Sequence, residues 1–115
     1  MTYEAAVELL IGHRWWLLRE DFGGYVESCR GFHGESMAAI DWQAVWTALE
    51  DGALSCSSGE RQVLRVAASI ADGVPIDLCD AVSSLDTVNA VLVARAVLAA
   101  GGQHEAADVL AGAGR

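Results

Sequence analysis

Lysine is absent from this sequence of 115 residues, and its seven basic residues are all arginines, against sixteen acidic residues. The arginines are scattered from Arg14 to Arg115, and the formal net charge is −9. Such a charge repels a nucleic-acid backbone unless basic residues are gathered in one patch. We therefore expect no direct nucleic-acid binding. A chain without lysine also lacks the Gly-Lys-Ser/Thr element of a nucleotide-binding phosphate loop.

Cysteine is scarce, with Cys29, Cys56 and Cys79 as its three occurrences and no Cys-x-x-Cys pair. An odd, widely spaced set of cysteines predicts neither a disulfide framework nor a zinc ribbon. Cys29 and His33 would share one face of a helix, but Gly31 between them disfavours a helix there. We expect no metal and no other cofactor.

Long apolar runs are also missing. The longest candidate, residues 90–100, is short for a membrane span and is interrupted by Arg95. The first ten residues contain Glu4 and Glu8 and have no basic segment, unlike a secretory signal. The sequence therefore predicts a cytoplasmic protein without a membrane partner.

The residues that are present favour a folded domain, because 53% are hydrophobic and the mean hydropathy is +0.30. We predict an all-α protein, a compact single-domain bundle of about five helices spanning residues 1–110, with a flexible tail at 111–115. We identify no strand.

One stretch, residues 57–75, carries its own start and stop signals. Ser57 and Glu60 have the spacing of a capping box, in which each side chain accepts from the other residue's backbone N–H. Gly73 suits the left-handed position that ends a helix, and Pro75 prevents continuation. The pattern predicts a core helix over residues 58–72.

Other helices are predicted from apolar periodicity. The first runs from Thr2 to about Glu20, kinked or broken near Gly12. Further helices are expected from Ser36 or Asp41 to residues 50–51, over 77–85, from a cap at Asp86 over 87–100, and as a turn at 104–110.

Residues 21–35 combine glycines with aromatic residues and are the least regular part of the chain. A short helical turn at 26–29 is possible within them. Loops of this composition form binding sites, and they also let a small fold turn a corner. Both interpretations remain open from the sequence.

Two helices contain the candidate partner-binding residues. Trp42 and Trp46 are one turn apart, and tryptophan is frequent both in cores and at interface hot spots, with an internal partner favoured. Helix 87–100 is apolar around nearly its whole circumference, so we expect it to be the most buried element or to pair with a copy of itself. The adjacent acids at 50–51 lie at a helix C-terminus, where the helix dipole is unfavourable. The candidate residues are Trp42, Trp46, Glu50, Asp51, Val93 and Arg95.

Several short segments resemble proteins of a known group. They are Trp42-Gln43-Ala44-Val45, Ser58-Gly59-Glu60-Arg61, Leu64-Arg65-Val66-Ala67-Ala68-Ser69, Leu85-Asp86 and Asn89. Over about residues 41–102 the chain resembles short uncharacterised proteins of actinobacteria and their phages. The resemblance implies a bacterial or phage cytoplasm and brings no activity with it.

Three functional hypotheses follow. The first is a small acidic cytoplasmic protein-protein interaction module without catalytic activity, which binds a protein partner or a copy of itself. The alternative is an acidic inhibitor or nucleic-acid mimic, possibly phage-encoded, that binds a basic protein. The second alternative is an enzyme or metal protein that depends on its Cys and His residues. The apolar composition favours the first.

Overall fold

The computed structural model describes residues 2–30, 33–34 and 36–113, and within them it contains six α-helices and one two-stranded sheet. The elements are α1 (Thr2–His13), η1 (Trp16–Leu18), η2 (Phe22–Tyr25), β1 (Val26–Arg30), β2 (Ser36–Ile40), α2 (Trp42–Asp51), α3 (Ser58–Asp72), α4 (Leu78–Ser83), α5 (Thr87–Ala100) and α6 (His104–Ala113). The prediction of a compact all-α fold is confirmed.

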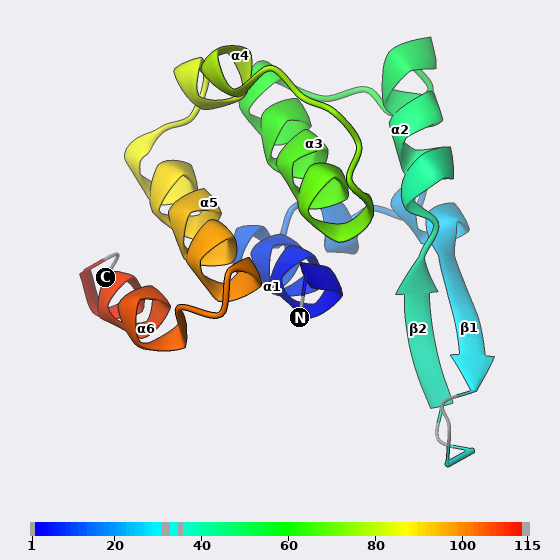
Figure 1. The fold of residues 1–115 in the computed structure, drawn as a ribbon. Coiled ribbons are helices and arrows are strands. Elements are labelled where there is room, and N and C mark those ends of the chain that lie inside the picture. Colours follow the sequence, from blue (N-terminus) through cyan, green and yellow to red (C-terminus); the bar gives the residue numbers. More distant parts are fainter. Residues whose placement is uncertain (1, 31–32, 35, 114–115) are drawn as a thin grey trace.

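Helix α3 lies at the centre of the bundle and packs against α1, α2, α4 and α5. Figure 1 shows α5 and α2 on opposite sides of α3, with α1 behind it and α6 outside α5. The buried residues of α3 are Gln62, Val63, Leu64, Val66, Ala67 and Ala68. The expectation that residues 87–100 form the most buried helix is wrong, because α5 buries only Val93 and Ala96. Val88 and Val97 of this helix are more than half exposed, so part of its circumference is uncovered.

The ends of α3 are those that the sequence predicts. Ser57 Oγ accepts from the N–H of Glu60 at 3.3 Å, and Glu60 Oε1 accepts from the N–H of Ser57 at 2.7 Å. These two bonds satisfy donors that the first turn of a helix leaves unpaired. Gly73 ends the helix with a φ of 70°, in the left-handed region that glycine tolerates.

Gly12 has a packing role instead of kinking the first helix. A Cβ atom at this position would lie 2.8 Å from Leu92 Cδ2, so glycine permits the close approach of α1 and α5. The helix ends one residue later, and Arg14 follows with a φ of 70°. The predicted break near Gly12 is therefore confirmed, whereas the predicted extension of this helix to about residue 20 is wrong. After the break, Trp16 is buried and its indole N–H donates to Glu60 O at 2.9 Å.

Residues 26–30 and 36–40 form an antiparallel hairpin in which Val26 pairs with Ile40 and Ser28 with Ala38. The sequence prediction of no strand, and of a helical turn at 26–29, is wrong. Each strand is only five residues long, which is too short for a clear alternation of apolar and polar side chains. Asp41, not Ser36, caps α2, and its Oδ1 accepts from the N–H of Ala44 at 3.1 Å. Part of the predicted glycine and aromatic loop, residues 31–32 and 35, lies outside the described residues.

The C-terminal helix is longer than the predicted turn. It continues through residue 113, while residues 114–115 of the predicted tail lie outside the described part. One hydrophobic cluster connects α1 through α5. None of the helices in the described ranges combines the length and apolar character that a bilayer crossing requires.

Replacing the N-cap of α3 should destabilise the whole protein, because α3 contacts four other helices. We expect Ser57→Ala to lower the free energy of unfolding by about 1 kcal/mol, measured by urea denaturation. Ser55→Ala is the matched control, since the side chain of this exposed residue makes no hydrogen bond among the described residues. Equal stabilities of the two variants would contradict a role for the cap.

A second prediction concerns His13, whose Nδ1 is buried without a hydrogen-bond partner. Burial lowers the pKa of His13 below 6.5, although the charges of Glu60 and Asp86 oppose this shift. The unfolded chain therefore binds a proton at a higher pH than the folded protein does. The stability contributed by the neutral imidazole is complete above pH 6.5 and decreases as the pH falls below it.

The test compares urea unfolding of the wild type and His13→Gln at about pH 7.5 and about pH 5.5. We expect the wild type to lose more stability on acidification than the variant. The other two histidines are common to both proteins and cancel in the comparison. Parallel pH profiles would show that His13 does not contribute.

Candidate functional site

The two tryptophans of α2 pack within the protein. Trp42 is 3% exposed and meets Tyr3 edge to face, with ring centroids 6.2 Å apart. Trp46 is partly buried, and the guanidinium carbon of Arg65 lies 4.8 Å from the centroid of its ring. The favoured internal partner for this pair is confirmed. Neither indole face is presented as a free, fully exposed surface.

Glu50 has a structural role that the sequence did not reveal. Its Oε1 lies 3.2 Å from Arg65 Nη2, so the guanidinium of Arg65 is held between this carboxylate and the Trp46 ring. The expectation that the 50–51 pair has no structural explanation is therefore wrong for Glu50. Asp51, the neighbouring residue, is exposed at the end of α2.

Val93 and Arg95 lie on different sides of α5. Val93 is 7% exposed and belongs to the hydrophobic core, whereas Arg95 lines a small pocket near α6. Helix α3 separates α5 from α2 in Figure 1. The six predicted residues consequently do not form one continuous surface, and their role in partner binding stays a prediction.

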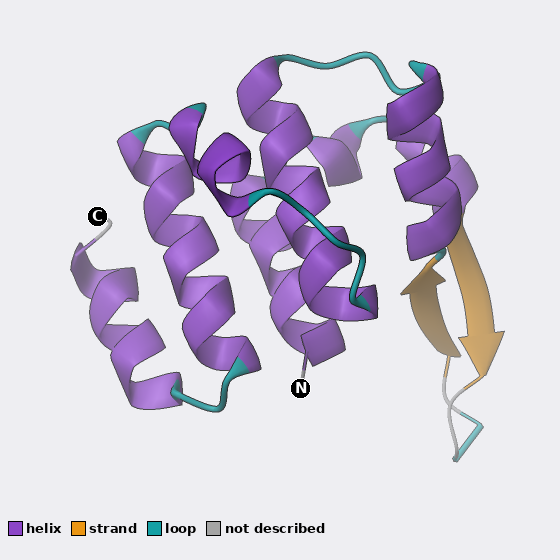
Figure 2. Cartoon of the chain, turned by 45° about the horizontal axis from the view of Figure 1, so that its top comes forward, coloured by secondary structure: helices purple, strands orange, loops and turns teal. Residues whose placement is uncertain are grey.

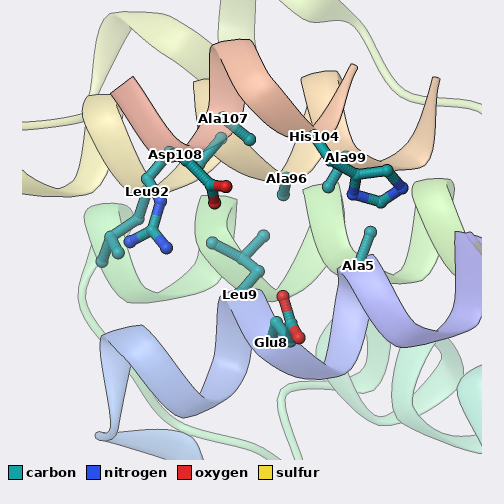
Figure 3. A pocket seen from close by; sticks show the side chains of 10 residues that line it. Ala5, Glu8, Leu9, Leu92, Ala96, Ala99, His104, Ala107 and Asp108 are labelled. Carbon is teal, nitrogen blue, oxygen red and sulfur yellow. The ribbon is translucent and has the colours of Figure 1, made fainter. Parts of the chain in front are cut away.

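The pocket beside Arg95 lies where α1, α5 and α6 meet. Glu8 approaches from α1 and Asp108 from α6, on opposite sides of the pocket, and His104 stands at one end (Figure 3). Arg95 Nε is buried and has no hydrogen-bond partner. The two ion pairs in the described part of the chain are Arg19–Asp21 and Glu50–Arg65, so neither involves Arg95. We call this site the Arg95 pocket.

The Arg95 pocket has a volume of about 70 Å³. Pockets that take organic ligands are larger, typically about 300–1,000 Å³. The arginine with two carboxylates nearby instead suits electrostatic attraction between α5 and its two neighbours. Arg95, the one charge of an otherwise apolar helix, thus lines the same pocket as two carboxylates.

An apolar groove runs along α5 and is bounded by Leu110 of α6. Its volume is about 360 Å³, and its lining residues are Leu85, Asp86, Thr87, Ala90, Val91, Ala94 and Leu110. Exposed apolar side chains occur on the same two helices, with Val97 56% and Val109 73% exposed. Both views show α6 at the edge of the bundle (Figures 1 and 2). We call this site the α5–α6 groove.

Sequence reasoning missed this groove because it treated residues 104–110 as a minor turn. A signal was present, since Ala90 and Ala94 are spaced one turn apart and small residues allow close approach of a neighbouring chain. The direction in which that face points depends on how α5 packs. No periodicity within α5 could supply this information, because its apolar residues surround the helix.

Asp86 is the acid that lines the α5–α6 groove, and the segment that forms the groove is acidic overall. Residues 77–113 contain five acids and one arginine, a net charge of −4. The acids are Asp77, Asp80, Asp86, Glu105 and Asp108. Acids also occur in α1, α2 and α3, so the negative charge is not confined to one side of the protein.

Comparisons with protein-family models, with curated proteins and with solved structures find no match to this chain. Within residues 2–30, 33–34 and 36–113, no three His, Cys, Asp or Glu residues form a group that could hold a metal ion. Cys56 and Cys79 are free thiols. The candidate sites in the described residues are therefore the α5–α6 groove and the Arg95 pocket.

The different burial of the two tryptophans predicts different costs of removing them. We expect Trp42→Ala to lower the free energy of unfolding by about 3–5 kcal/mol, since it leaves a cavity in the core. Trp46→Ala should cost less, about 1–2 kcal/mol, because only a partly buried ring and its contact with Arg65 are lost.

Urea unfolding of both variants, with Thr47→Ala on the exposed side of α2 as the control, measures these costs. Trp46→Ala as destabilising as Trp42→Ala would contradict the assigned burial. The unfolding free energies of the two variants also show whether a loss of partner binding by either variant reflects unfolding of the protein.

Proposed function

We propose that this protein is a non-catalytic protein-protein interaction module that binds a basic, amphipathic helical segment of another protein in the α5–α6 groove. The observation that carries the proposal is an open apolar groove that Asp86 lines, in a chain whose net charge is −9. An amphipathic helix would place its apolar face in the groove and its basic residues toward the acids.

The apolar lining supports this mode of binding. Ala90 and Ala94 have short side chains, so the backbone of a partner helix can approach α5 closely between Leu85 and Leu110. Exposed apolar side chains such as Val97 extend the surface along the helix. Contiguous apolar surface on a small protein is a common property of interaction sites.

Charge favours a basic partner over a second copy of this chain. Two copies meeting through the groove would bring together the Asp86 side chains of two chains that each carry a net charge of −9. This repulsion opposes association, whereas lysine or arginine on a partner would be attracted and steered toward the groove. The acidic composition therefore favours a basic protein as the partner.

The proposal assigns no reaction to the protein. The Arg95 pocket, with a volume of about 70 Å³, is small for an organic substrate. Burial raises the pKa of the Cys56 thiol, although Arg61 opposes the shift. A thiol held in its protonated form at neutral pH is a weak nucleophile.

A synthetic helix tests the groove directly. The probe is an amphipathic peptide of leucine and lysine with about fifteen residues, the length of about four helical turns, titrated by calorimetry. Ala90→Arg places bulk and positive charge in the groove, and Ala53→Arg makes the same change at an exposed position outside its lining. We expect Ala90→Arg to weaken binding at least tenfold and Ala53→Arg to have little effect.

Equal affinities of the two variants for the peptide would contradict the groove as the binding site. A peptide of the same composition in scrambled order should bind weakly, since it cannot present an apolar face. Light scattering over a concentration series measures the mass in solution and so tests whether a second copy of this chain occupies the groove. We expect a monomer, and a dimer that Ala90→Arg dissociates would replace the basic partner with a second copy.

A further inference from the structure

A second pocket, polar throughout, lies beside the first turns of α3 and is independent of the α5–α6 groove. Its volume is about 370 Å³. It is lined by Cys56, Ser58, Arg61, Gln62, Arg65, Asp80 and Ser84. We call it the arginine pocket, because it gathers two of the seven arginines of a chain whose net charge is −9.

The fold brings these residues together from two helices. Arg61 and Arg65 are one turn apart on α3, so both guanidinium groups reach the same side of the helix. The end of α4 packs on the start of α3, where a Cβ atom on Gly59 would lie 3.5 Å from Ser84 O. This contact places Ser84 opposite Ser58, with a hydroxyl from each helix at the pocket.

Gln62 is the observation that points to a ligand. It is 8% exposed and is the buried polar residue of the described core. It lines the arginine pocket, and its side-chain amide makes no hydrogen bond within the described residues. The amide atoms of Gln62 are not among the fully buried unpaired atoms, so they are open to the pocket. A ligand with acceptor oxygens in the pocket would satisfy the amide N–H donors.

We propose that the arginine pocket binds the phosphate group of a small phosphate monoester. Arg61 and Arg65 supply charge-assisted donors to the phosphate oxygens, in the planar arrangement that favours two-point contacts. Gln62 and the two serine hydroxyls supply neutral donors around them. Asp80 is then left to accept from a hydroxyl or ammonium group of the same ligand.

The charged groups around the pocket are consistent with this ligand. Arg65 is held by Glu50 and by the Trp46 ring, so its guanidinium is already positioned. The Glu60 carboxylate is engaged in the capping box, where it accepts from the N–H of Ser57. Burial raises the pKa of Cys56, so its thiol adds no negative charge near the phosphate. Asp80 is the remaining acid among the lining residues.

The first experiment titrates inorganic phosphate into the uniformly ¹⁵N-labelled full chain at constant ionic strength. Chemical shifts of the Gln62 side-chain amide and of the Arg61 Nε–H are followed. We expect both signals to move together along one saturable curve. Arg61→Gln should weaken the apparent affinity at least tenfold, while Arg14→Gln, with the same change in net charge, should leave it near the wild-type value.

Titrations with phosphate monoesters then show which kind of molecule carries the phosphate group that the pocket binds. O-phosphoethanolamine should bind more tightly than inorganic phosphate, because its ammonium can pair with Asp80, and ethanolamine alone should not bind. In Asp80→Asn this advantage should disappear. A blocked phosphoserine peptide that binds more tightly than O-phosphoethanolamine would replace the small monoester with a phosphorylated protein segment.

Two results would overturn the proposal. One is the absence of any movement of the Gln62 amide at millimolar phosphate in a protein whose spectrum shows that it is folded. The other is equal weakening by Arg61→Gln and Arg14→Gln, which would indicate non-specific attraction of the anion to positive charge. Neither result bears on the α5–α6 groove, whose lining shares no residue with this pocket.

Discussion

The first turn of α3 fixes the positions of several separate parts of the chain. Ser57 and Glu60 close its capping box, and the carbonyl of Glu60 accepts from the indole N–H of Trp16. The end of α4 packs on the adjacent Gly59, where a Cβ atom would be in ordinary contact with Ser84 O at 3.5 Å. Because α3 also contacts α1, α2 and α5 along its length, the placement of this turn determines where each of them packs. The arginine pocket is formed at the same junction.

Local signals predicted the parts of the fold that depend on neighbouring residues. The bounds of α3 and α5 follow from caps at Ser57 and Asp86, which are properties of a few consecutive positions. The contact of Gly12 with Leu92 depends on residues far apart in the sequence, whereas the hairpin and the break at Arg14 are local features without a clear sequence signal. The candidate sites, like the contact of Gly12, depend on distant residues. Both the groove and the arginine pocket combine residues from different helices, so their lining could not be read from helical periodicity.

The absence of lysine is reflected in how the cationic side chains are used. The guanidinium carbon of Arg19 lies 4.8 Å from the Trp15 ring centroid and 5.0 Å from that of Trp16, while Arg65 covers Trp46. A planar guanidinium stacks on an indole and still donates hydrogen bonds at its edge, as Arg19 does to Asp21 and to Ser55 O. A lysine ammonium has no planar face with which to stack on the ring while its edge donates. Three of the four tryptophans thus have an arginine against them.

The peripheral position of α6 has a thermodynamic consequence. This helix packs mainly on α5, and Ala107 is its one residue in the buried hydrophobic set of the described chain. Elements with so little buried surface open locally at a lower free energy than the core. Opening of α6 would remove Leu110 from the α5–α6 groove and Asp108 from the Arg95 pocket at the same time. Occupancy of the groove and closure of the last helix are therefore linked equilibria, so a bound partner would slow amide exchange in α6 beyond the residues that it touches.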